Sequence, residues 1–249
     1  MIHIKTEQEI AKMQKSADVL VKVKQKVWDA IQIGVTPREL DKIAEDEIKK
    51  HGCKSNFKGY GGFPNVACIS VNDTLIHGIP NDEPLKDGDI ISVDMGCIYE
   101  GYHSDSAFTK GVGNISKEDM KLMDVAKNAF YAGVDAIKPG ARVGDISFAI
   151  GQYVSSQGMF CPFEFTGHGI GKNLHEDPYI PNMGKKGVGP LLKDGMVICL
   201  EPMILQKSPI VKVLSDKWTV KSQDGKNTAH YEHMVLIKDG RGIIMTGGI

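Results

Sequence analysis

The sequence has 249 residues, of which 41% are hydrophobic and 24% are charged, an ordinary composition for a globular protein with a sizeable core. The formal charge is −1 and no block of Lys and Arg stands out, so the strongly basic surface of a nucleic-acid or membrane-binding protein is excluded. No segment resembles a signal peptide or reaches the ~18 apolar residues of a membrane span.

A chain of this length favours one domain, residues 1–249, with two domains as the alternative. The five cysteines include no CxxC pair, and several, such as Cys68 and Cys199, lie in apolar runs. They are typical of reduced core residues rather than of disulfides or thiolate ligands of a metal. We therefore expect a cytoplasmic protein.

Two helices are expected at the start of the chain. A capping box at residues 6–9 begins a run of apolar residues at helical spacing that ends near Gly34. A second capping box at 36–39 places Pro37 at the first helical position, and Gly52 supplies a stop signal.

Short β-rich segments follow, and the helical pattern then returns at 116–137 and 145–157. The expected strands cover 66–71, 89–95, 97–99, 106–110, 196–205, 211–214, 218–220, 231–237 and 242–245.

The order of two helices followed by strands thus occurs twice, in halves of about 1–115 and 116–249. A shift of 106 positions places Gly34 on Gly140 and Gly52 on Gly158. The matches predict two related halves that share one sheet, with helices packed on one side. Chance coincidence is the alternative.

Four acidic residues lie in apolar β-segments, where an ionised carboxylate is costly unless it is paired or binds a metal. They are Asp94, Asp105, Glu201 and Glu232. A hairpin turn at 99–101 would bring the two aspartates nearly opposite one another, and like charges in that position destabilise a sheet. Either one acid holds a proton or a cation neutralises both.

A histidine offers a further metal ligand. His168 lies between glycines in 167–171, in neither a helical nor a strand pattern. Four carboxylates and one imidazole suit two divalent cations, because the formal charges then cancel, and these ligands favour Mn, Fe, Co or Zn. For any one of these residues, the alternative is an acid on a solvated face or a hydrogen-bonded structural histidine.

Five motifs are spread in order over essentially the whole chain. They are 68–73 with His77 to Pro80, 93–96 with Asp105, 167–171 with His175 and Glu176, Glu201 to Met203, and Tyr231 to His233. Together they resemble the motifs of bacterial type I methionine aminopeptidases, which have the pita-bread fold. The resemblance implies an α+β architecture in which an antiparallel curved sheet carries helices on its outer face and consists of two pseudo-symmetric halves.

The resemblance implies two divalent metal ions held by five side chains. Asp105 and Glu232 would bridge both ions. Asp94 would bind one ion only, and His168 and Glu201 would bind the other. The ions would activate a water molecule for attack on the scissile carbonyl.

The resemblance also implies catalytic and substrate-binding roles. Glu201 would transfer the proton, while His77 and His175 would contact the substrate and stabilise the oxyanion. A pocket for the methionine side chain would be formed by Phe57, Tyr60, Phe63, Cys68, Leu174 and Trp218.

Two positions depart from the family pattern in this pocket. Leu174 stands where many relatives carry an aromatic residue, and Gly61 stands where some carry histidine. Both changes enlarge or soften the pocket rim, and ordinary core packing is the alternative reading of the pocket residues. Some family members also bind a monovalent cation, which the resemblance would place near Asn72, Thr74 and Thr228.

The implied reaction is removal of the N-terminal methionine from nascent proteins whose second residue is small. The enzyme would be a monomer that associates transiently with the ribosome. A proline dipeptidase would use the same five ligands, but such relatives usually carry an additional N-terminal domain. Non-catalytic binding proteins with this fold have lost metal ligands, which this chain retains. The short interval from His175 to Glu201 lacks the insertion of type II aminopeptidases.

Overall fold

Four α-helices form two consecutive pairs in the computed structural model, which describes residues 1–249. The first two begin at Thr6 and Thr36, whose side chains accept hydrogen bonds from the third helical residue in complete capping boxes, as predicted. The Ser116 side chain accepts a hydrogen bond from the Asp119 N–H at the start of the third helix. None of the helices has the length and apolar content that crossing a bilayer requires. The helices are α1 (Glu7–Ala30), α2 (Pro37–Lys50), α3 (Lys117–Asp135) and α4 (Val143–Ser156).

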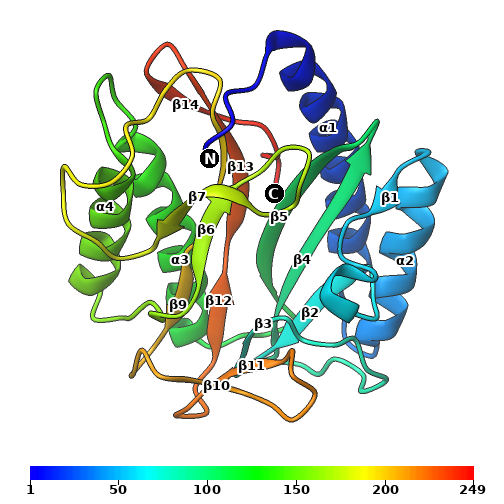
Figure 1. Cartoon of the computed structure of the whole chain (residues 1–249). Helices are drawn as coiled ribbons and strands as arrows, with labels where there is room; N and C mark the ends of the chain where they lie inside the picture. Colours follow the sequence, from blue (N-terminus) through cyan, green and yellow to red (C-terminus); the bar gives the residue numbers. More distant parts are fainter.

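A nine-stranded antiparallel sheet runs between the helix pairs (Figure 1). Its strand order is β1-β4-β5-β13-β8-β6-β7, with β14 beside β13 and β2 beside β4, so strands from both parts of the chain share one sheet. The strands are β1 (Lys54–Ser55), β2 (Ala67–Val71), β4 (Ile90–Tyr99), β5 (Tyr102–Gly111), β6 (Thr166–Gly169), β7 (Glu176–Pro181), β8 (Val197–Leu200), β13 (Glu232–Lys238) and β14 (Arg241–Ile244).

Two small sheets and one short 3-10 helix, η1 (Tyr60–Gly62), complete the fold. β3 pairs with β11, which also pairs with β10, and β9 pairs with β12. These strands are β3 (Thr74–Ile76), β9 (Met203–Leu205), β10 (Val211–Val213), β11 (Val220–Ser222) and β12 (Thr228–His230).

Each helix pair covers an apolar core of its own. Leu20 of α1 and Leu40 of α2 are fully buried in a cluster with Val93 of β4. Phe130 of α3 and Ile150 of α4 are fully buried in a second cluster, which includes residues of β8 and β13. Figure 1 shows α1 and α2 on one flank of the sheet and α3 and α4 on the other. Val93 of β4 and Val235 of β13, which belong to these two clusters, lie an odd number of residues from Asp94 and Glu232 and therefore point to the opposite face of their strands. Both helix pairs thus cover the same face of the sheet, and the other face is available for a site.

Several predicted strand boundaries are wrong, for identifiable reasons. The strands expected at 89–95 and 97–99 form one strand, β4. Gly96 does not end the strand; it leaves room for a neighbouring side chain, because a Cβ atom there would lie 2.3 Å from Asn56 Oδ1. The strand expected at 196–205 is divided at Glu201 and Pro202, since proline has no N–H for a sheet hydrogen bond. The strand expected at 218–220 instead forms as β11, two residues later.

The second helix of each pair matches the sequence shift that predicts related halves. α2 and α4 each contain 14 residues, and both of their bounds differ by 106 positions. Whether the complete halves, 1–115 and 116–249, superpose stays a prediction.

Candidate active site

The β4–β5 hairpin places Asp94 and Asp105 on the same face of the sheet. Asp94 pairs with Ala107, and Asp105 pairs with Gly96, so the two acids are diagonal neighbours two positions apart instead of directly opposed. Residues two positions apart in a strand point to the same face. The turn consists of Glu100 and Gly101, both at positive φ, and it lies inside the predicted segment 99–101.

Glu232 joins these acids from the other part of the chain. It is the first residue of β13 and pairs with Ala107, which also pairs with Asp94. Asp94, Ala107 and Glu232 therefore form one row across three strands, and the small side chain of Ala107 leaves the space between the two acids free.

His168 lies in β6, so the prediction that it belongs to no strand is wrong. Its flanking glycines are required by close strand packing, because Cβ atoms at Gly167 and Gly169 would lie 2.4 and 2.2 Å from the carbonyl oxygens of Cys199 and Asp177. The ring Nδ1 is 2.9 Å from the Gly169 carbonyl oxygen. Donation from Nδ1 leaves Nε2 as the lone-pair nitrogen.

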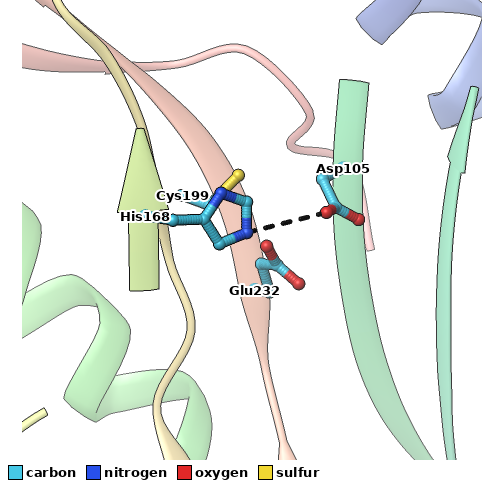
Figure 2. A group of neighbouring side chains, drawn as sticks. All are labelled: Asp105, His168, Cys199 and Glu232. Carbon is cyan, nitrogen blue, oxygen red and sulfur yellow. Dashed lines mark ion pairs between the residues drawn. The ribbon is translucent and has the colours of Figure 1, made fainter. Parts of the chain in front are cut away.

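The lone-pair nitrogen of His168 faces two of the acids. Nε2 is 3.4 Å from Glu201 Oε1 and 3.9 Å from Asp105 Oδ2. Glu201 follows β8 directly and precedes Pro202. Figure 2 shows His168, Asp105 and Glu232 converging from β6, β5 and β13, with Cys199 beside them.

Burial raises the pKa values of all four carboxyl groups. The pKa of Asp94 rises to about 7, and those of Asp105, Glu201 and Glu232 rise well above their usual range because the groups are desolvated and repel one another. These acids cannot all be ionised without added positive charge.

The hydrogen bonding of the acids fits bound cations. Asp94 Oδ1, Asp105 Oδ1 and Glu232 Oε1 are buried and have no hydrogen-bond partner. Such atoms are rare in proteins and need a partner, and carboxylate oxygens suit divalent cations. Ligand atoms of Asp105, His168, Cys199 and Glu232 lie within 4.8 Å of one another. A second group of ligand atoms, from Asp94, His230 and Glu232, shares Glu232.

The thiol of Cys199 borders this cluster. Burial and the nearby carboxylates raise its pKa well above the usual range. It also belongs to an apolar core cluster, in agreement with its predicted role as a core cysteine.

The two predicted substrate-contacting histidines line the same cavity as the acids. His77 follows β3 at φ 57°, and its ring meets the edges of Phe165 and Trp218. His175 Nδ1 is 2.7 Å from Tyr60 Oη, and its ring centre is 4.3 Å from that of His168. Burial lowers the pKa of His77 to about 4, and that of His175 is also lowered.

A single cavity of about 260 Å³ brings together all the residues that the sequence singles out for the metal ions, for catalysis and for the methionine pocket. Four of its apolar residues are buried, and Phe63 packs edge-on against Trp218 at 5.2 Å. Gly61 leaves room for Trp218, because a Cβ there would lie 3.1 Å from the indole. The cavity is lined by Phe57, Tyr60, Phe63, Cys68, His77, Asp94, Asp105, His168, Leu174, His175, Glu201, Trp218 and Glu232.

The residues expected to hold a monovalent cation also lie together. Thr228 Oγ1 donates hydrogen bonds to the carbonyl oxygens of Asn72, at 3.2 Å, and Thr74, at 2.9 Å. The cation itself stays a prediction.

Sequence reasoning overlooked two buried polar residues beside the acids. His230 lies two residues before Glu232, and the period of two in extended backbone could have revealed it. Lys24 of α1 is fully buried, and its Nζ donates hydrogen bonds to Ser106 Oγ and the Thr246 carbonyl oxygen, both at 2.9 Å. Its place among apolar residues at helical spacing was the available signal.

Comparison with known proteins agrees with this geometry. The model of metallopeptidase family M24 matches residues 11–239. A methionine aminopeptidase of Mycoplasma capricolum is 49% identical over 243 residues, 96% of each chain. The crystal structure of a methionine aminopeptidase from Thermotoga maritima has a TM-score of 0.97 at 38% identity, with 100% of each chain covered.

A prolidase from Pyrococcus furiosus shares the fold more distantly, with a TM-score of 0.80 and 25% identity; the match covers 99% of this chain but 66% of the prolidase. The resemblance to bacterial methionine aminopeptidases and the pita-bread architecture are thus confirmed. The chain belongs to metallopeptidase family M24.

Proposed function

We propose that this protein hydrolyses the N-terminal methionine from polypeptides whose second residue is small. The observation that carries the proposal is the group of buried, unpartnered carboxylate oxygens on the floor of an apolar cavity. Methionine aminopeptidases at high identity over the full chain support this reaction over that of a prolidase. Retention of all five acidic and histidine ligands argues against a non-catalytic binding protein.

The metal centre would use two divalent ions chosen from Co, Mn, Fe and Zn. Asp105 and Glu232 would contact both ions, because they lie on neighbouring strands between the other ligands. Asp94 would hold one ion, and His168 with Glu201 the other. When bound, the ions supply Lewis acidity that polarises the scissile carbonyl and acidifies a water molecule.

The surrounding residues would position the substrate and move its protons. Glu201 faces His168 at the edge of the acid cluster, where its carboxylate would accept a proton from the attacking water and pass it to the leaving amine. His77 and His175 would donate hydrogen bonds to the carbonyl oxygen as its charge develops. Tyr60 orients His175 through their 2.7 Å contact.

The apolar wall would select methionine. Phe57, Phe63, Cys68, Leu174 and Trp218, together with Tyr60, surround the space next to the acids. An unbranched, polarisable thioether adapts to such a surface and makes favourable contacts with aromatic rings.

Methionine release from Met-Ala and Met-Gly peptides tests the proposal, with Xaa-Pro peptides as the comparison. Chelation should abolish release, and added Co, Mn or Fe should restore it. Full turnover by a rigorously metal-free sample would overturn the metal mechanism. Preferred cleavage of Xaa-Pro would establish the dipeptidase alternative.

A variant of His175 separates catalysis from metal binding. His175→Ala should lower kcat by about 10²–10³-fold, the usual effect of losing an oxyanion donor, while metal content stays unchanged. Tyr60→Phe, which leaves the histidine in place, should have a smaller effect. Loss of metal from His175→Ala would show that its assigned role is wrong.

Five free cysteines, all buried, support a cytoplasmic location. We further propose a monomer that meets its substrate during a transient association with the ribosome, since nascent chains carry the methionine to be removed.

A further inference from the structure

His230 is a second buried imidazole at the acid cluster. It is the last residue of β12, it is 2% exposed, and neither of its ring nitrogens has a hydrogen-bond partner. Its Nε2 is 3.8 Å from Glu232 Oε2, which is too long for a hydrogen bond. Unpartnered buried nitrogens of this kind require an explanation.

The backbone fixes the position of this ring. Thr109 Oγ1 accepts a hydrogen bond from the His230 N–H at 2.9 Å and donates one to the His230 carbonyl oxygen at 2.8 Å. Thr109 belongs to β5, which also carries Asp105. The two hydrogen bonds therefore hold the backbone of His230 against this strand.

The ring lies next to two carboxylates that form a metal-sized group. Ligand atoms of Asp94, His230 and Glu232 all lie within 4.8 Å of one another. Metal bonds to nitrogen or oxygen are ~2.0–2.2 Å long, so two ligands of one ion are at most ~4.2–4.4 Å apart. The 3.8 Å separation of His230 Nε2 and Glu232 Oε2 meets this limit, and no pair of ligand atoms in the group is more than 4.8 Å apart.

A neighbouring histidine shows that this situation is specific. His233, also buried, has partners for both ring nitrogens: Tyr231 Oη lies 3.0 Å from Nε2, and Ser106 Oγ lies 3.0 Å from Nδ1. The hydrogen-bonding needs of His233 are therefore met by the protein, whereas those of His230 are not.

We propose that His230 is a nitrogen ligand of the divalent ion held by Asp94 and Glu232. The proposal rests on the proposed two-metal function and adds a ligand to it. Each ion then has one imidazole, His168 on one and His230 on the other. A mixed nitrogen and oxygen site binds Fe, Co and Zn more favourably than a purely carboxylate site, which suits harder ions such as Mn.

Proton NMR of the Co(II)-loaded protein tests this assignment directly. A coordinated imidazole gives a strongly shifted, exchangeable ring N–H signal. The wild type should show two such signals, His230→Gln should show one, and His233→Gln, the matched control, should retain two. The count in the wild type needs no variant, so a poorly folded variant does not prevent the test.

Equilibrium dialysis with Co(II) supplies an independent measurement. His230→Gln should weaken the affinity for one of the two Co(II) ions by about 10–100-fold and leave the affinity for the other unchanged. One imidazole signal in the wild type, or unchanged affinities in His230→Gln, would overturn the His230 assignment while leaving the metal centre intact. A wild type that binds no Co(II) would overturn the metal centre and the assignment together.

Discussion

Two polar clusters are buried on opposite faces of the same strands. The front cluster, Asp94, Asp105 and Glu232, faces the cavity, and each member has an unpartnered oxygen. The rear cluster faces α1 and consists of Lys24, Ser106, His233 and Thr246. Two of its members lie next to those of the front cluster in the chain, since Ser106 follows Asp105 and His233 follows Glu232.

Hydrogen bonding distinguishes the two clusters, although both are buried. In the rear cluster, Lys24 and His233 have partners within the protein, and Ser106 Oγ donates to the Glu232 carbonyl oxygen at 2.7 Å. A polar group whose bonds are all made inside the protein serves the fold, whereas one that is left incomplete is available to a ligand. The clusters should therefore respond differently to substitution.

The largest effect is expected from Asp105→Asn in the front cluster. Loss of the shared ligand should reduce kcat/KM on the order of 10³-fold, because several kcal/mol of metal polarisation are lost. The metal-free variant should be no less stable than the metal-free wild type, since repulsion from Glu232 and Asp94 is relieved. Peptide hydrolysis measures kcat/KM, and urea unfolding measures the stability of the metal-free proteins, with exposed Asp18→Asn as the control. A marked loss of metal-free stability would contradict the comparison.

Lys24→Met in the rear cluster should instead change the pH dependence of stability. Burial lowers the pKa of Lys24 to about 7 from 10.5, so the unfolded chain binds more protons between these values. The free energy of unfolding of the wild type should rise with pH across this window, by a total on the order of 5 kcal/mol. Below about pH 7 the contribution is constant.

Urea unfolding between pH 6.5 and 9.5, ~3 pH units that include most of this rise, provides the measurement. Lys24→Met should lack the rise, and exposed Lys22→Met on the same helix should retain it. Parallel profiles for all three proteins would show that Lys24 is not held in the buried environment described.

Metal removal should lower stability through the front cluster alone. An ion present at 100 times its Kd stabilises the folded state by ~2.7 kcal/mol. Chelation should remove that contribution from the wild type and from Lys24→Met equally, and should leave Asp105→Asn almost unaffected. Thermal unfolding with and without chelator measures the shift; an equal shift in Asp105→Asn would place the ion elsewhere.

The smallest effect is expected for Ser106→Ala. The variant loses hydrogen bonds to Lys24 and to the Glu232 carbonyl oxygen, which should cost about 1–2 kcal/mol of unfolding free energy. Metal content measured on the folded protein should stay at the wild-type value. A variant that folds normally but has lost an ion would show that the two clusters are not independent.

Local sequence signals determined the helices and the central hairpin well. Capping boxes mark the starts of α1 and α2, and the acids of β4 and β5 are conspicuous in apolar strands. β1, β3 and β12 contain two or three residues, too few for a period of two to be visible. β6 was also missed, because its glycines are required by close contact with neighbouring strands and give the sequence no strand pattern.

The candidate site was predictable to the extent that motifs carry it. The family resemblance also supplied, by position, residues as distant in sequence as Phe57 and Trp218, which composition and spacing alone would not have joined. Lys24 and His230 lie outside those motifs. Their significance depends on partners in other strands and helices, and a single sequence does not reveal which polar groups will lack one.

The junction of β5 with β13 has a consequence for assembly. Only two residue pairs join these strands, against ten in the β4–β5 hairpin, yet the junction unites segments that are synthesised far apart in time. An ion bound by both Asp105 and Glu232 would link β5 to β13 and stabilise this short junction. Metal binding would then require that β13, which is synthesised late, has paired with β5. Amide hydrogen exchange at the β5–β13 junction would slow once the ion is bound.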